Sequence, residues 1–160
     1  GFLSLPDDVM YLYLPAYGRC RRIAAHVKNK NFAGTTLSYE NLEARQYSTQ
    51  WNATVKSAGE THYVLELTPK EGTRTEYSRL EVKVRKDNWY PMQVDYFDKA
   101  GKPYKRMLSE EVTRKGPYWE SMRKTMKNLQ TGRATHLILE SVVHDQGLSD
   151  ERFSTRYLQR

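Results

Sequence analysis

Apolar and charged residues alternate strictly along one segment of the chain, and this two-residue period constrains the fold more than any other feature. Within Ser78–Lys86, Leu80, Val82 and Val84 alternate with charged residues. Successive side chains of a β-strand point to opposite faces of the sheet, so this segment places its apolar residues on one face and its charges in water. We therefore expect a strand of an antiparallel sheet that has one apolar face.

The same alternation recurs along most of the chain, and turn residues such as Ala58–Gly59 and Thr131–Gly132 separate the segments. This spacing predicts a meandering antiparallel sheet, sandwich or barrel, in a single domain over residues 1–160. The first strand is apolar on both sides and is expected to be buried on both. The predicted strands are Val9–Leu14, Cys20–Ile23, Gln50–Ser57, His62–Leu67, Ser78–Lys86, Met92–Tyr96, Tyr104–Thr113, Tyr118–Leu129 and Ala134–Val143.

Few helices are expected. The best prediction is Ser38–Arg45, whose first residue can cap the helix and whose two glutamates favour its N-terminal dipole. A helix of about two turns needs tertiary support, so we expect Tyr39 and Leu42 to pack against the sheet. Near the C-terminus we expect one helical turn capped by Ser149, followed by an edge strand at Tyr157–Leu158.

The composition favours a globular fold and an anionic partner. Of the 160 residues 38% are hydrophobic and 28% are charged, and the formal net charge is +7. No apolar run approaches the ~20 residues that a membrane-spanning helix requires, so none is expected. The first five residues lack the pattern of a signal peptide, so none is expected within this chain. The positive charge favours phospholipid headgroups, anionic glycans or nucleic acid.

Catalytic and metal-binding patterns are weak. Cys20 is the only cysteine, which excludes an internal disulfide framework and a multi-cysteine zinc site. The four histidines are far apart in the sequence, and Asp7–Asp8 and Glu110–Glu111 are more typical of solvated carboxylates than of an acid–base pair. No nucleophile or phosphate-loop motif occurs. We therefore expect no catalytic residue, no metal site and no cofactor.

Basic residues mix with aromatic residues at Tyr104–Arg106 and Tyr118–Lys127, a composition that can bind single-stranded nucleic acid. Outer faces of strands commonly carry Lys and Arg in any case, partly as protection against edge pairing. Nucleic acid is therefore not the expected partner. A basic β-rich module for an anionic polymer or protein stays open as an alternative function.

The inward residues of the predicted strands form a continuous apolar wall, and few helices are available to cover it. Two interpretations stay open: the wall is a core filled by other side chains, or it is a cavity for an apolar ligand. In the second interpretation the ligand-binding residues are Trp51, Val55, Tyr63, Leu65, Leu67, Leu80, Val82, Val84, Met92, Val94 and Tyr96.

Several short motifs extend over most of the chain, and each is weak alone. The motifs are Tyr11–Pro15, Arg21–Ile23, Phe32-x-Gly34, Ser38–Leu42, Met126-x-Asn128, Thr131–Gly132 and Thr135-x-Leu137. In this order and spacing, they resemble the bacterial outer-membrane lipoprotein-sorting (LolA-like) family.

The resemblance implies a periplasmic protein with a strongly curved antiparallel sheet, an incomplete barrel whose concave side is covered by one or two short helices. That concave side would receive lipid or lipoprotein acyl chains, delivered and accepted by membrane-associated proteins. Tyr39 and Leu42 would then belong to a lid. Family members usually have further strands and a helix before the segment that matches Gly1, so we expect this chain to lack that portion.

Overall fold

The computed structural model describes residues 1–6, 9–43 and 47–159. Its residues form two compact units. The sheet unit comprises residues 34–36 and 46–142, and the terminal unit comprises residues 1–33, 37–45 and 143–160. The single domain expected over residues 1–160 stays a prediction. The carboxylate pair Asp7–Asp8 lies outside the described residues, as does the end of the predicted helix at Ala44–Arg45.

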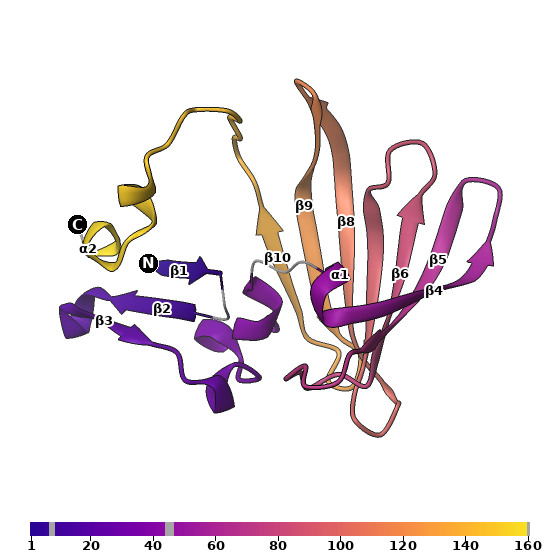
Figure 1. The fold of residues 1–160 in the computed structure, drawn as a ribbon, viewed down its shortest axis with the longest axis horizontal. Helices are drawn as coiled ribbons and strands as arrows, with labels where there is room; N and C mark the ends of the chain where they lie inside the picture. The colour runs from indigo at the N-terminus through magenta and orange to yellow at the C-terminus, as the bar shows by residue number, and fades with distance from the viewer. Residues whose placement is uncertain (7–8, 44–46, 160) are drawn as a thin grey trace. The chain divides into compact units, whose positions relative to one another are not determined.

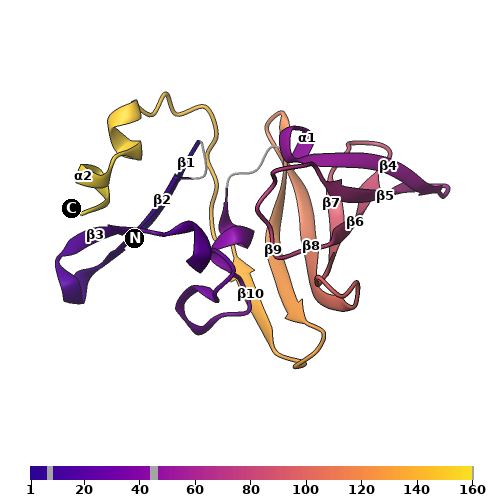
Figure 2. The same ribbon diagram turned by 60° about the horizontal axis from the view of Figure 1, so that its bottom comes forward.

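The sheet unit is a seven-stranded antiparallel meander in which each strand pairs with its neighbour in sequence, in the order β10-β9-β8-β7-β6-β5-β4 (Figure 1). The sheet curls, so that β4 runs across the view of Figure 1 while β8 and β9 run up it, and Figure 2 shows this curl from another side. The prediction of a mainly β fold with a curved, unclosed antiparallel sheet is confirmed. The strands are β4 (Trp51–Ala58), β5 (His62–Pro69), β6 (Arg79–Arg85), β7 (Pro91–Phe97), β8 (Pro103–Lys115), β9 (Tyr118–Asn128) and β10 (Ala134–Ile138).

One helical turn, α1 (Tyr47–Gln50), leads directly into β4. The carbonyl of Gln50 accepts hydrogen bonds from the Lys70 amide and the Thr73 hydroxyl, each at 2.9 Å. These bonds attach the junction between α1 and β4 to the connection that follows β5. The sequence pattern predicted a strand from Gln50 onward, whereas the strand begins one residue later.

The register of the strands aligns apolar residues from β4 to β9 on one face of the sheet, here called the apolar face. Ala53, Leu67 and Leu80 are partners across β4, β5 and β6, and Leu80 pairs in turn with Tyr96 of β7. Because partners across an antiparallel ladder project to the same side, each such row crosses the sheet on one face. A second row consists of Val55, Leu65, Val82, Val94, Met107 and Met126.

The opposite face, here called the polar face, carries ion pairs. Glu66 and Glu81 are directly opposed on β5 and β6, and Lys56 and Arg79 each form ion pairs with both. Two like charges placed opposite one another destabilise a sheet, and the two cations offset that repulsion. One face of the sheet is therefore suited to water and the other is not.

A three-residue segment from before the sheet, Gly34–Thr36, lies against β9 and β10 within the sheet unit. The Thr36 amide donates to Oγ1 of Thr135 at 2.9 Å, and the Thr36 hydroxyl donates to the carbonyl of Met126 at 2.7 Å. Arg133 donates to the carbonyl of Gly34 at 3.2 Å. Thr36 is buried at this contact, so the segment covers part of the apolar face near β10.

The hairpin between β6 and β7 is attached to β9 by a partly buried hydrogen bond. The hydroxyl of Tyr90 accepts from the Ser121 amide at 3.0 Å. Burial raises the pKa of Tyr90 above its usual value, so this hydroxyl is neutral at physiological pH. Ser121 is itself buried, and its hydroxyl donates to the Glu110 carbonyl.

The terminal unit contains a three-stranded antiparallel sheet, β1 (Phe2–Leu5), β2 (Val9–Leu14) and β3 (Arg19–Arg22), in which β2 and β3 correspond to the predicted strands Val9–Leu14 and Cys20–Ile23. In β2 only Met10 is fully buried, so the expected burial on both faces is wrong. The remaining elements are 3₁₀ turns η1 (Pro15–Tyr17), η2 (Ala25–Val27), η3 (Phe32–Gly34), η4 (Tyr39–Leu42) and η5 (Asp150–Phe153), and the helix α2 (Thr155–Leu158).

The predicted helix at Ser38 is shorter than expected. Ser38 caps the turn as predicted, accepting from the Asn41 amide at 3.3 Å, while Oδ1 of Asn41 accepts from the Ser38 amide at 2.9 Å. The turn ends at Glu43, whose backbone is extended. A 3₁₀ turn therefore replaces the predicted α-helix, because so short a helix gains too few hydrogen bonds to offset its nucleation.

Three C-terminal predictions need correction. The last strand stops at Ile138 instead of Val143. The turn after Ser149 forms, but the Ser149 side chain makes no capping bond. The predicted edge strand at Tyr157–Leu158 is helical, because Ser154 accepts from the Tyr157 amide at 3.2 Å and starts α2. In the described part of the chain, no helix has the length and apolar character needed to cross a bilayer.

Replacing Leu80 with alanine should destabilise the protein by about 2–5 kcal/mol, because Leu80 is completely buried and its truncation leaves a cavity. Denaturant unfolding monitored by circular dichroism measures this change. The matched control is Val55→Ala on the same face, where 61% of the side chain is exposed, and it should change the free energy of unfolding by less than about 1 kcal/mol. Equal losses in the two variants would contradict the assignment of Leu80 to the core.

Replacing Tyr90 with phenylalanine should destabilise the protein by about 1–3 kcal/mol, because the buried Ser121 amide loses its acceptor. Hydrogen exchange at the Ser121 amide should accelerate, whereas exchange in β5 should not. Unchanged exchange at Ser121 would show that the hydroxyl does not hold this hairpin.

Candidate functional site

An apolar cleft of about 310 Å³ opens on the apolar face, between α1 and strands β4 to β6. Its walls are almost entirely hydrocarbon, because register partners on neighbouring strands contribute aliphatic side chains. Trp51 and Leu67 are buried in these walls, whereas Ala53 at the edge strand is exposed. The lining residues are Tyr47, Ser48, Trp51, Ala53, Leu65, Leu67, Val82, Val84, Trp89 and Pro91.

Over β6 to β8 the apolar face is filled by the protein's own side chains, whereas Val55 on β4 is exposed. Tyr77, which precedes β6, is completely buried and packs on Tyr96 with ring centroids 4.8 Å apart. Leu80 and Lys105 are also fully buried, and the Lys105 ammonium lies 3.8 Å from Glu76. The two interpretations left open by the sequence therefore each describe a part of the face: one part is core and the other is a cleft.

Aromatic rings and a cation stand at one edge of the cleft. Tyr63 and Trp89 stack with their planes 4° from parallel and their centroids 5.8 Å apart. The ammonium of Lys86 lies 4.6 Å from the Tyr63 ring centroid, within cation–π distance. An apolar surface therefore ends at a positive charge on this side, an arrangement that suits a ligand with an apolar chain and an anionic head.

Trp89 is the most unusual residue of the site. It lies in the turn between β6 and β7 with φ at 59°, and 68% of its surface is exposed. A bulky side chain rarely adopts the left-handed backbone conformation, which costs on the order of 1–2 kcal/mol. Hydrogen bonds from the Trp89 amide to the Arg85 carbonyl, and from the Tyr90 amide to Asn88, hold the turn in this shape.

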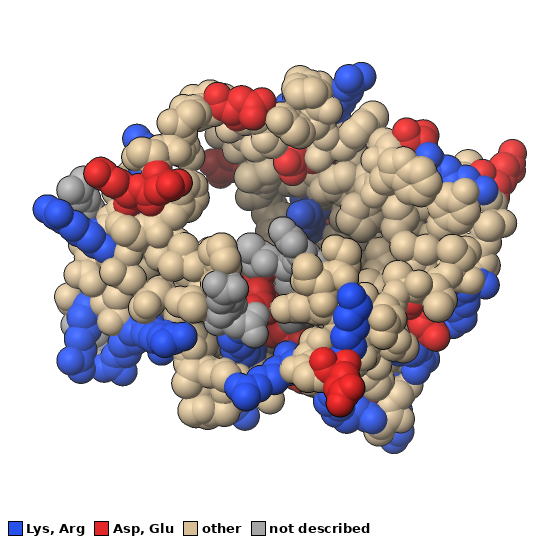
Figure 3. All heavy atoms as spheres, viewed as in Figure 1, with Lys and Arg blue, Asp and Glu red and all other residues tan. Residues whose placement is uncertain are grey.

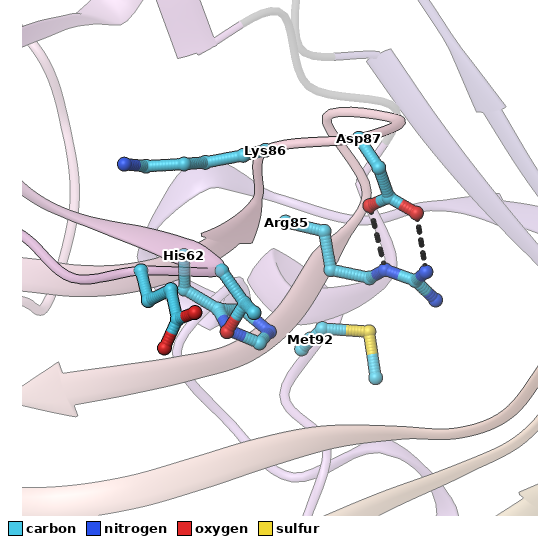
Figure 4. Close-up of a pocket in the computed structure, with 7 residues that line it drawn as sticks. His62, Arg85, Lys86, Asp87 and Met92 are labelled. Carbon is cyan, nitrogen blue, oxygen red and sulfur yellow. Dashed lines mark hydrogen bonds and ion pairs between the residues drawn. The ribbon is translucent and has the colours of Figure 1, made fainter.

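A second, more polar cleft of about 690 Å³ lies beside the same turn and contains Met92 (Figure 4). Arg85 and Asp87 form a two-bonded ion pair there, and this hydrogen bonding from the guanidinium lowers the pKa of the Asp87 carboxyl. In Figure 4 the side chain of Lys86 points away from that pair. The lining residues are Glu60, Thr61, His62, Arg85, Lys86, Asp87 and Met92.

The structure distributes the predicted ligand-binding residues over several environments. Trp51, Leu65, Leu67, Val82 and Val84 line the apolar cleft together, while Leu80 and Tyr96 lie in the filled part of the face. Met92 departs from the predicted wall, because a bulge between β6 and β7 sets Pro91 opposite Val84 and leaves Met92 in the polar cleft. Val55 and Val94 continue the apolar face on either side, and Tyr63 stands at the cleft edge through its contact with Trp89.

The lid predicted at Tyr39 and Leu42 stays a prediction, since both residues belong to the terminal unit and the cleft belongs to the sheet unit. Tyr39 packs within its own unit, with its ring centroid 5.6 Å from that of Phe32 and 6.3 Å from that of Phe2.

The predicted ligand-binding set missed five lining residues: Tyr47, Ser48, Ala53, Trp89 and Pro91. The first two belong to a helical turn too short to produce a periodic signal. Trp89 was overlooked because it falls in a turn, although a tryptophan directly between two alternating strands is itself an unusual signal.

Polar groups that could support chemistry do not gather at the apolar cleft. In the part of the chain that the structure describes, no group of three or more His, Cys, Asp or Glu side chains is arranged to bind a metal. Glu110 accepts a hydrogen bond from Thr125, while its neighbour Glu111 has a left-handed backbone conformation with φ at 52°. The cleft can exclude water and hold hydrocarbon, and its lining provides few polar groups for catalysis or metal binding.

Known proteins resemble this chain in both sequence and fold. A putative outer membrane lipoprotein-sorting protein domain from Vibrio parahaemolyticus is 28% identical, with a TM-score of 0.86, over 98% of this chain and 68% of that one. A DUF1329 family protein from Desulfovibrio piger is also 28% identical, with a TM-score of 0.89, over 98% of this chain and 67% of that one. No curated protein matches the sequence significantly.

A more distant structure supports the fold alone. A LolA superfamily protein from Nitrosomonas europaea is 17% identical, with a TM-score of 0.69, over 93% of this chain and 67% of that one. A family model with the description "-like: Uncharacterized protein" matches residues 1–160. The chain therefore belongs to the family whose model spans it, and its fold is LolA-like, as its short motifs predicted.

Proposed function

We propose that this protein is a periplasmic carrier that binds the acyl chain of a lipid or lipoprotein in the apolar cleft. The observation that carries the proposal is the cleft itself, an opening of about 310 Å³ whose walls are mostly hydrocarbon. Monomeric proteins seldom leave a concave apolar surface uncovered without a binding role.

Burial of hydrocarbon supplies the driving force. Each methylene removed from water contributes ~0.8 kcal/mol, so about ten methylenes contribute roughly 8 kcal/mol before ordering losses. Binding of this kind has little dependence on salt, because it involves few charges.

The resemblance to lipoprotein-sorting proteins supports the choice of cargo and of compartment. The solved relative from Vibrio parahaemolyticus is described as a putative outer membrane lipoprotein-sorting protein domain. A carrier of this kind takes its cargo from one membrane-associated partner and passes it to another. We propose the same type of partners and the same periplasmic location for this chain.

The alternative from another class is a basic module that binds an anionic polymer or protein, for which the net charge of +7 is the supporting observation. That function requires affinity that falls steeply with salt. On the polar face, however, Lys56, Arg79 and Arg106 are already engaged with carboxylates. The carrier is therefore the better-supported proposal.

Replacing Ala53 with phenylalanine should fill the cleft and weaken binding of a fluorescent long-chain fatty acid by tenfold or more. Ala53 lines the cleft from an exposed edge strand, so the larger side chain enters the cleft without disturbing the buried core. Fluorescence titration of the delipidated protein measures the change.

The matched control is Asn52→Phe, which adds the same side chain one residue away on the opposite face. This variant should bind the fatty acid as the unmodified protein does. Absence of fatty-acid binding by the unmodified protein, together with absence of lipid in its solvent extract by mass spectrometry, would rule out the carrier.

A further inference from the structure

Three hairpin turns of the sheet lie at the same end, because the strands form a simple antiparallel meander (Figure 1). They connect β4 to β5, β6 to β7, and β8 to β9. The second turn presents Trp89, and the third begins the strand that carries Tyr118, whose surface is 42% exposed. The hydrogen bond between Tyr90 and Ser121 attaches the second hairpin to β9.

Cations accompany these exposed aromatic residues. Lys86 precedes Trp89 in the same turn, and Arg114 and Lys115 precede the turn between β8 and β9. The one acidic side chain of the β6–β7 turn, Asp87, is neutralised by its ion pair with Arg85. We call Lys86, Trp89, Arg114, Lys115 and Tyr118 the hairpin-tip surface. Figure 3 shows that, from this side, charged side chains lie mainly around the rim of the sheet unit, with uncharged ones across its middle.

Beyond its stack on Tyr63, Trp89 contributes little to the packing of the fold. Its side chain is exposed, its backbone is strained, and a glycine or asparagine would fit the left-handed conformation better. A strained, exposed tryptophan at the edge of an apolar cleft points to an interaction outside the protein. Tryptophan and tyrosine beside lysine and arginine form the composition that suits the interface between water and lipid headgroups.

We propose that the hairpin-tip surface docks on a bilayer that contains anionic phospholipids, with Trp89 inserted at the headgroup level. Lys86, Arg114 and Lys115 interact with lipid phosphates, and the indole ring of Trp89 occupies the interface. Because Trp89 also lines the apolar cleft, docking brings the open side of the cleft to the membrane. An acyl chain then passes between bilayer and cleft without crossing bulk water, a consequence that rests on the proposed carrier function.

The docking itself is tested with the full chain and vesicles of phosphatidylglycerol and phosphatidylethanolamine. The protein should sediment with these vesicles, bind more weakly to pure phosphatidylcholine, and release as salt increases. Its tryptophan emission should shift to the blue on binding. Equal binding to neutral and anionic vesicles, or none to either, would overturn the proposal.

Trp89→Asn is the decisive variant, because asparagine tolerates the left-handed backbone and should not unfold the turn. Its affinity for anionic vesicles should fall by tenfold or more, with loss of the blue shift. Lys86→Gln should weaken binding about fivefold, as expected for one cation near an anionic surface. Unchanged affinity of Trp89→Asn would overturn the proposal.

The matched control is Ile138→Asn, which removes another exposed apolar residue from the far edge of the same sheet, where 69% of the side chain is exposed. This variant should bind vesicles as the unmodified protein does. If Ile138→Asn and Trp89→Asn lose the same amount of vesicle affinity, binding depends on general surface hydrophobicity and not on one docking site. That result would overturn the proposal.

The Ala53→Phe variant separates this inference from the carrier function. It should keep vesicle binding and lose fatty-acid binding. An unmodified protein that binds fatty acid but no vesicles overturns the docking and leaves the carrier function standing. An unmodified protein that binds vesicles through Trp89 but no fatty acid supports the docking and overturns the carrier function.

Discussion

A seven-stranded antiparallel sheet with one apolar face must remove that face from water, and the other features of the sheet unit follow from how it does so. Strand register places two continuous rows of apolar side chains on the same side, from β4 as far as β7 and β9. Such rows supply most of the stabilisation available to a sheet of this kind. The charges on the polar face contribute little by comparison, since partly exposed ion pairs are weak.

Side chains of the sheet unit cover some parts of the apolar face and leave another part open. The open part is the candidate site. Tyr77 and Lys105 fill the space over β6 to β8, and Thr36 covers the region near β10. Over β4 to β6 the described residues provide α1 and the turn with Trp89, which border the space without filling it. Among the described residues of this unit, no side chain fills the cleft. Hydrocarbon from a ligand would complete the same packing.

Sequence alternation predicted the sheet well because β5 and β6 obey it almost without interruption, and turn residues marked most of the strand boundaries. It failed where the backbone breaks the period. The bulge between β6 and β7 places Met92 outside the predicted apolar wall. The alternation of residue types in the sequence gives no sign of such a bulge. Short elements were also not predicted correctly. The helix α1 is a single turn, and the turn after Ser38 is too short for its sequence to distinguish an α-helix from a 3₁₀ helix. Tyr77 was missed because it lies in a connection, although it is fully buried.

An open cleft beside an edge strand carries a risk, because an exposed strand edge invites pairing with other chains. β4 is such an edge, and beyond Trp51 all of its residues are exposed. Two features of the strand oppose pairing: a register shift between Val55 and Ser57 bends the strand, and Lys56 at that shift carries a charge. Buried Trp51 and the bonds to the Gln50 carbonyl anchor the start of the strand. The strand is thereby fixed at its beginning and irregular along its length, which keeps one wall of the cleft in place while leaving the edge unsuitable for a second sheet.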